Sequence, residues 1–98
     1  MTMLTLNSEE ELEIISQLAF KSSDVLATER EKVNRKANLL KAAVLDSISR
    51  EEVVLTLEDN YSFKKLRSRV IATGDERVML DKGLSIPVQC IHHVEFLQ

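Results

Sequence analysis

The spacing of apolar residues divides the chain near Ser49. Before this point, residues 9–48 contain neither Gly nor Pro, and apolar residues recur at intervals of three and four, which is typical of amphipathic helices. After it, short runs of Val, Leu and Ile alternate with polar residues between turn-forming residues, which is typical of β-strands. This order predicts an α+β fold in one domain, with a helical region over residues 1–49 and a small β-barrel over residues 50–98.

The helical region has a clear start and one long apolar stripe. Ser8 and Glu11 have the spacing of a capping box, so we expect the first helix to begin at Ser8 or Glu9. The stripe weakens between Thr28 and Lys36, where charged residues dominate. Its members are Leu12, Ile15, Ala19, Ser22, Leu26, Val33, Ala37, Leu40, Val44 and Ile48.

The length of this region leaves two alternatives open. One straight helix over residues 8–48 would be about 61 Å long, whereas a domain of this size has a radius of gyration near 13 Å. Either the helix breaks, at Ser22–Asp24 or at a second capping box of Thr28 and Glu31, and forms a helical hairpin, or it stays continuous and pairs with its copy in a dimer. In the dimer alternative the charged middle is a solvated face, comprising Glu29, Arg30, Glu31, Lys32, Arg35 and Lys36.

Five strands are predicted in the second half of the chain. Turn residues separate them at Asp59–Asn60, at Gly74–Asp75 and at Asp81–Gly83, and Pro87 marks an edge or a strand end. The predicted strands are residues 53–58, 61–72, 78–80, 84–86 and 92–97. Because closure hides the edges of so small a sheet, we expect an N-terminal helix or helical hairpin followed by a five-stranded antiparallel Sm-like or SH3-like barrel.

Composition and charge exclude several classes of protein. The 98 residues carry 13 Lys and Arg against 16 Asp and Glu, and this net charge of −3 opposes attraction of the whole molecule to nucleic acid. The single cysteine, Cys90, cannot form an internal disulfide, and the chain shows no secretory signal, so we expect a cytoplasmic protein. No apolar run approaches the roughly 20 residues that span a bilayer, so we expect no membrane insertion.

A row of cations on the predicted second strand is the candidate anion or nucleic-acid face. Lys65, Arg67 and Arg69 alternate with other residues and therefore share one face of the strand at intervals of about 6.6 Å, with Lys64 beside them. Such a row can neutralise the phosphates of a nucleic acid. The commoner alternative is a solvated face whose cations pair with acidic neighbours, and we favour it because aromatic stacking partners are few.

The sequence offers little for metal binding or catalysis. Cys90, His92 and His93 lie within four residues, but on a strand Cys90 and His92 share one face while His93 points away. They supply at most two ligands to one site, and no third residue is recognisable that would orient a catalytic base. We therefore expect no catalytic residue, no metal and no cofactor, and the chain is predicted not to be an enzyme.

The closing segment carries a resemblance to known families. Residues 77–96 resemble the last part of the Sm-like barrels of the bacterial YolD-like family, where a strand, a tight turn, an Ile-Pro pair and a one-turn helix precede a final Ile-x-x-Val/Ile-Glu strand. The order of helix and then barrel, with residues 53–59 as the opening strand, is similar to the Rho-binding antiterminator family. The resemblance implies a small barrel and, for the second family, action by binding a protein.

The helical stripe is the remaining candidate surface. Its apolar side chains form a face wider than one small barrel is expected to cover, which predicts contact with another chain. The alternative that stays open is that a helical hairpin packs this face over the open end of the barrel within the same chain. The expected association face is Leu12, Ile15, Leu18, Leu26 and Leu40. The predicted function is therefore a non-catalytic regulatory or adaptor module that binds a protein partner and forms a homo-oligomer, most simply a homodimer. The alternative is an Sm-like module that binds nucleic acid through the basic strand.

Overall fold

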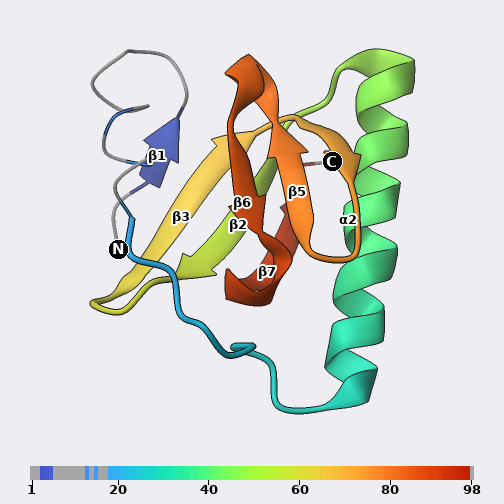
Figure 1. The fold of residues 1–98 in the computed structure, drawn as a ribbon. Helices are drawn as coiled ribbons and strands as arrows, with labels where there is room; N and C mark the ends of the chain where they lie inside the picture. The colour runs from blue at the N-terminus through green and yellow to red at the C-terminus, as the bar shows by residue number, and fades with distance from the viewer. Residues whose placement is uncertain (1–2, 6–12, 14, 16–17, 98) are drawn as a thin grey trace.

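The chain folds into two small β-sheets and one long helix (Figure 1). The structure, a computed structural model, describes residues 3–5, 13, 15 and 18–97, so the predicted helix start at Ser8 or Glu9 lies outside the described residues. In chain order the elements are β1 (Met3–Thr5), α2 (Glu29–Ser49), β2 (Val53–Glu58), β3 (Phe63–Ser68), β4 (Val70–Thr73), β5 (Arg77–Leu80), the 3-10 turn η1 (Asp81–Gly83), β6 (Ser85–Pro87), the 3-10 turn η2 (Val88–Cys90) and β7 (Ile91–Phe96).

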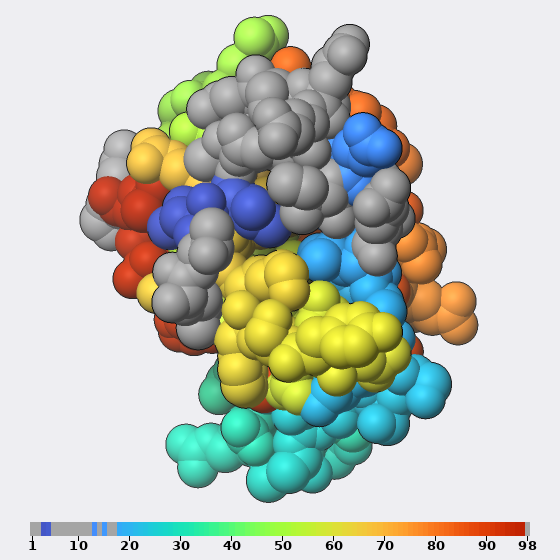
Figure 2. All heavy atoms as spheres, turned by 90° about the vertical axis from the view of Figure 1, so that its left-hand side faces the viewer, coloured from blue at the N-terminus to red at the C-terminus, as the bar shows by residue number. Residues whose placement is uncertain are grey.

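The strands form a four-stranded mixed sheet and a three-stranded antiparallel sheet. The first has the order β1-β3-β2-β7, in which β1 runs parallel to β3 and the other neighbours are antiparallel. The second has the order β4-β5-β6. Along β5, the buried Val78 and Leu80 alternate with exposed residues, as predicted for an antiparallel strand with one solvated face. Figure 2 shows the molecule from the side where β1 lies along β3.

The predicted five-stranded antiparallel barrel, Sm-like or SH3-like, is wrong, because the described strands form two open sheets and not one closed sheet. Hydrogen-bonded pairing is interrupted at two points. The predicted second strand, residues 61–72, divides at Arg69 into β3 and β4, which belong to different sheets. Pro87, which has no N–H to donate, ends β6, and the η2 turn then carries the chain across to β7 in the other sheet. The fold is α+β with two open sheets.

The helix α2 begins at the predicted second capping box. The Glu31 N–H donates to the Thr28 hydroxyl at 3.2 Å, and the Thr28 N–H donates to the Glu31 carboxylate at 3.3 Å. Glu29 adds a second negative charge at the positive end of the helix dipole. The helix ends where Arg50 adopts a left-handed conformation, with φ of 53°. The Arg50 N–H donates a hydrogen bond to the Asp46 carbonyl at 2.9 Å.

A continuous helix over residues 8–48 is excluded, because residues 18–28 are not helical. The Leu26 N–H donates to the Asp24 carboxylate at 2.8 Å, a local bond that competes with helical hydrogen bonds. Phe20 forms an isolated β-bridge with the turn after β2, so this segment runs beside the first sheet (Figures 1 and 2). The longest dimension of the described chain, 35 Å, also leaves no room for a straight helix of about 61 Å.

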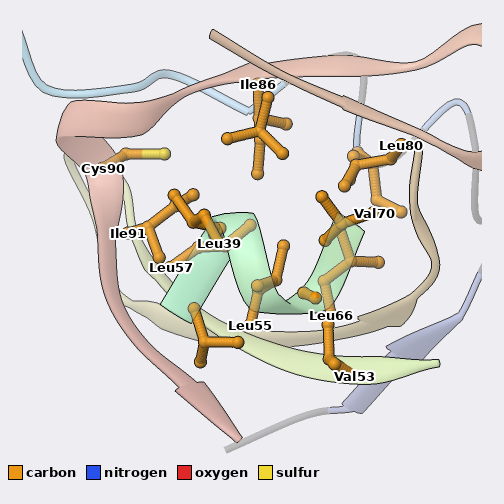
Figure 3. Close-up of a cluster of buried hydrophobic side chains, with 14 of the residues drawn as sticks. Leu39, Val53, Leu55, Leu57, Leu66, Val70, Leu80, Ile86, Cys90 and Ile91 are labelled. Atoms are coloured by element: carbon orange, nitrogen blue, oxygen red, sulfur yellow. The ribbon is translucent and has the colours of Figure 1, made fainter. Parts of the chain in front are cut away.

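The hydrophobic core lies between the two sheets, and α2 covers one side of it (Figure 3). Ile86 and Leu80 of the three-stranded sheet face Leu55 and Leu57 of β2 across the core, and Leu39 reaches in from α2. The helix packs against β4 and β7. The fully buried side chains of this core include Leu39, Val53, Leu55, Leu57, Leu66, Val70, Val78, Leu80, Ile86 and Ile91.

Candidate functional site

One side of α2 carries a row of apolar side chains that the described chain leaves uncovered. Val33 is 63% exposed, Leu40 49%, Val44 54% and Ile48 76%, and Ala37 between them is also exposed. Successive members are four, three, four and four residues apart, so all five lie on one face of the helix. We call these five residues the outer stripe. An uncovered apolar row of this length on a rigid helix is the candidate functional surface.

The opposite side of α2 is the one that packs against the sheets. Its buried residues are Arg35, Leu39 and Ala42, and the last two are 1% and 0% exposed. Leu39 and Leu40 are neighbours in sequence, yet the first is fully buried and the second is half exposed. The helix therefore has an inner apolar face that the fold uses and an outer stripe that the fold does not use.

The structure separates the residues of the predicted association face. Leu12 lies outside the described residues. Ile15 and Leu26 are buried within the chain itself, and Leu18 is half-buried against the core. Among the described members of that prediction, only Leu40 lies on the outer stripe. The sequence contained the signal for the other four stripe residues in their helical spacing, but it did not show that their side faces solvent.

A buried ion pair fixes the position of α2. In the alternative of a continuous helix that pairs with its copy, Arg35 was expected on a solvated face, but it is only 7% exposed. Its Nη1 and Nη2 donate to the two carboxylate oxygens of Asp24 at 2.9 and 2.6 Å, and Nη1 also donates to the Ile91 carbonyl at 3.1 Å. These hydrogen bonds hold the pKa of Asp24 below its usual value. The guanidinium thereby connects α2 to the segment before it and to β7.

A second polar cluster surrounds Glu58 at the end of β2. One carboxylate oxygen lies 2.6 Å from His92 Nε2, and the other forms an ion pair with the Lys21 ammonium. A register shift between β2 and β7 accompanies this contact, and such bulges redirect side chains. Burial, with the nearby Lys21 charge next in importance, lowers the pKa of His92. The imidazole is thus engaged with Glu58 and with the Phe63 ring, whose centroid lies 5.0 Å away.

The cysteine is inaccessible in the folded chain. Cys90 is 0% exposed, and its thiol donates to the Pro87 carbonyl at 3.0 Å. Burial raises the pKa of the Cys90 thiol to about 12. Since the thiolate is the nucleophile and the metal ligand, the folded protein presents almost none at neutral pH.

We expect Cys90 to be unreactive toward Ellman's reagent at neutral pH while the protein is folded, and to react once the chain is unfolded in guanidinium chloride. The physical reason is its burial and raised pKa. The measurement is the release of the coloured thiolate with and without denaturant. Equal rates in the two conditions would contradict the buried position of the thiol.

The cations of the predicted anion face are mostly neutralised by the chain itself. On β3 the side chain of Leu66 points into the core, so Lys65 and Arg67 lie on the other face. Three of the four cations form ion pairs, which agrees with the solvated-face interpretation and disfavours a phosphate-binding row. The pairs are Lys64 with Asp59 at 2.9 Å, Arg67 with Glu52 at 3.2 Å, and Arg69 with Asp46 and Asp81 at 3.4 Å each.

The turn between β2 and β3 depends on the buried carboxylate of Asp59. One oxygen accepts hydrogen bonds from the Tyr61 and Ser62 N–H groups, each at 2.8 Å, and the other accepts from the Lys64 ammonium at 2.9 Å. Burial by itself raises the pKa of Asp59, but the hydrogen bonds from Lys64, Ser62 and Tyr61 outweigh it, so the pKa lies below its usual value. The ionised form of this carboxylate is therefore part of the folded structure.

We expect the free energy of unfolding to decrease as the pH falls below about 4. Asp24 and Asp59 have lower pKa values in the folded chain than the 3.8 of an unperturbed aspartate. Their contribution to stability is complete above the unfolded pKa and is lost as the pH falls through the folded pKa. Urea unfolding at a series of acidic pH values measures this decline.

Asp59→Asn should make the decline of unfolding free energy with falling pH shallower, and the exposed Asp75→Asn serves as the control. An Asp59→Asn variant with the acid dependence of the wild type would contradict the role of Asp59.

A shallow depression of about 440 Å³ lies beside the end of α2. The Lys41 ammonium sits 4.6 Å from the centre of the Phe96 ring within it, and the Arg67 cation is paired with Glu52. Small-molecule sites gather a few polar groups in a mostly apolar cavity, whereas five of the nine residues that line this depression are charged. Its lining includes Lys41, Arg50, Glu52, Arg67, Phe96 and Leu97.

The described residues do not assemble a metal centre. Over residues 3–5, 13, 15 and 18–97, no group of three or more His, Cys, Asp or Glu side chains is placed to hold a metal ion. Cys90 and His92 have different partners, as described above, and His93 is exposed. In the same part of the chain, no helix combines the length and the apolar character that crossing a membrane requires.

Comparisons with known proteins found no match for this chain. No protein-family model matches it, and neither a curated protein nor a solved structure matches it. The resemblance of residues 77–96 to the YolD-like family, and of the order of elements to the Rho-binding antiterminator family, stays a prediction.

Proposed function

We propose that this protein is a non-catalytic regulatory or adaptor module, which binds another protein chain through the outer stripe of α2. The observation that carries the proposal is the exposure of Val33, Leu40, Val44 and Ile48, each between 49% and 76%, in one helical row. Single exposed apolar residues are common on protein surfaces. A contiguous apolar row is different, because the largest apolar patch on a monomer, about 300 to 600 Å² in area, is often a functional surface.

The state of the chemically active side chains supports binding over catalysis. Cys90 is buried with a raised pKa, and His92 is held against Glu58. A catalytic site needs a nucleophile or base that substrate can reach, together with a group that orients it. Substrate cannot reach Cys90, and His92, which Glu58 orients, has no nucleophile hydrogen-bonded to it among the described residues.

The way α2 is held also suits a docking role. Binding surfaces gain affinity when they are rigid before the partner arrives. The Arg35–Asp24 pair and the inner residues Leu39 and Ala42 fix the helix on the sheets. The outer stripe consists only of Ala, Val, Leu and Ile side chains, which fits the apolar face of a partner helix.

Photo-crosslinking in the native host tests the proposal. The photoreactive residue benzoylphenylalanine is placed at Leu40, at Ile48 and, as a control, at Tyr61, which is 85% exposed on the turn after β2. We expect irradiation to link a protein chain to the first two positions and not to Tyr61, with products identified by mass spectrometry. Equal yields at all three positions, or no product at Leu40 and Ile48, would overturn the proposal.

A further inference from the structure

We propose that the outer stripe pairs with the outer stripe of a second copy of this chain, with the two helices antiparallel, so that the protein is a two-fold homodimer. This inference rests on the proposed function, because it names the partner of the same surface. A two-fold axis requires a surface that is complementary to itself. Three features of α2 meet this requirement.

The first feature is the order of the side chains along the outer stripe. Its spacing of four, three, four and four residues reads almost the same in both directions, with Leu40 near the middle. An antiparallel partner therefore places Leu40 beside its own copy, the small Ala37 opposite Val44, and Val33 opposite Ile48. Small residues opposite larger ones allow the side chains of two helices to interdigitate.

The second feature is the charge at the two ends of the helix. Glu29 lies in the first turn and Arg50 follows the last, and antiparallel pairing brings Glu29 of one copy toward Arg50 of the other. Among the described residues, no ion pair is formed by Arg50. Antiparallel helices also place opposite ends of their dipoles together.

The third feature is that the flanking lysines turn back onto their own chain. The Lys36 ammonium pairs with Asp75 at 3.3 Å, and the Lys41 ammonium lies over the Phe96 ring at 4.6 Å. Their aliphatic stems then border the stripe while their charges point away from it. The outer stripe is left clear for an apolar contact.

The extent of the surface sets the expected strength of the dimer. From Val33 to Ile48 the stripe is about 22 Å long, and its exposed apolar area is on the scale of a few hundred Å². A standard interface buries about 800 Å² on each partner. The stripe with its bordering stems is smaller than this, in the size class of weak and transient complexes, so we expect a reversible dimer with a dissociation constant in the micromolar range.

Single-cysteine variants test whether the partner is a second copy of this chain and whether the two α2 helices run antiparallel. With the helix axes about 8 to 10 Å apart, a short bismaleimide should link Leu40→Cys to itself, because this position lies near the two-fold axis. It should not link Ile48→Cys to itself, but a mixture of Val33→Cys and Ile48→Cys should give a linked pair. Cys90 should not react with the bismaleimide because it is buried. Efficient linking of Ile48→Cys to itself would overturn the antiparallel arrangement.

Sedimentation equilibrium of the full chain provides a second, independent measurement. We expect the wild type to move from monomer to dimer across the micromolar range, and Leu40→Glu to stay monomeric at the same concentrations. A wild type that is monomeric throughout, with no linking of Leu40→Cys, would overturn the homodimer. In that case photo-crosslinks to a different chain would leave the proposed function standing, and their absence would remove it too.

Discussion

Replacing Asp24 with alanine is expected to lower the free energy of unfolding by about 3 kcal/mol, since a buried charge loses its partner. The Arg35 guanidinium is 7% exposed and would keep only the Ile91 carbonyl as an acceptor, which does not neutralise it. For a chain of this size the change corresponds to a fall in melting temperature of about 15 °C. Urea unfolding monitored by circular dichroism, at one fixed protein concentration, measures the loss.

The matched control is the exposed ion pair between Lys36 and Asp75. Its side chains are 67% and 86% exposed, so Asp75→Ala should cost about 0.5 kcal/mol or less. Adding Arg35→Met to Asp24→Ala should recover part of the loss, because an apolar side chain then replaces the unpaired charge. Equal losses for Asp24→Ala and Asp75→Ala would contradict the anchoring role of the Arg35–Asp24 pair.

Leu39→Ala is expected to cost about 3 kcal/mol of unfolding free energy, whereas Leu40→Ala should cost about 0.5 kcal/mol or less. The two residues are neighbours on α2, but Leu39 is 1% exposed in the core and Leu40 is 49% exposed on the outer stripe. Truncating the first leaves a cavity in the core, whereas truncating the second removes a side chain that is half in solvent and leaves no enclosed cavity. The comparison is made at a protein concentration low enough to keep the chain monomeric.

The same pair of variants separates folding from association. At higher protein concentration Leu40→Ala should weaken the dimer, since its side chain lies at the centre of the proposed interface. Comparable losses of monomer stability for Leu39→Ala and Leu40→Ala would contradict the division of α2 into an inner face and an outer stripe.

Local signals in the sequence located most of the elements correctly. The capping box of Thr28 and Glu31 marks the start of α2, because its hydrogen bonds involve only residues three apart. The polar residue Asp59 stands at the end of β2, and its carboxylate forms the turn that follows. The short apolar run of residues 78–80 between two turn signals identified β5. Each of these features depends on residues that are only a few positions apart in the sequence.

Contacts between distant residues were not predictable in the same way. The pattern of apolar and polar residues is the same for strands in a closed barrel and in two open sheets, so it did not reveal the interruptions at Arg69 and Pro87. The pairing of β1 with β3 is a second example. Leu4 pairs with Leu66 across more than sixty residues of chain, and no local rule predicts such a pairing.

The candidate site was also only partly predictable, because it depends on which side of α2 packs against the sheets. Helical spacing identified an apolar stripe that includes Leu40, but spacing alone does not say which side of a helix faces the core. Arg35, which the continuous-helix alternative placed in solvent, is buried, because Asp24 forms hydrogen bonds with it from outside the helix. The sequence therefore indicated the members of the outer stripe without showing that they are exposed.

The central claim is that the outer stripe of α2 is the surface through which two copies of this chain associate, and not part of the core. Its most direct test is the melting temperature of the wild type and of Leu40→Glu over a hundredfold range of protein concentration. A dimer that dissociates on unfolding melts at a higher temperature as its concentration rises. The account predicts this rise for the wild type and a constant value for Leu40→Glu. A constant melting temperature for the wild type, or the same rise in both proteins, would contradict it.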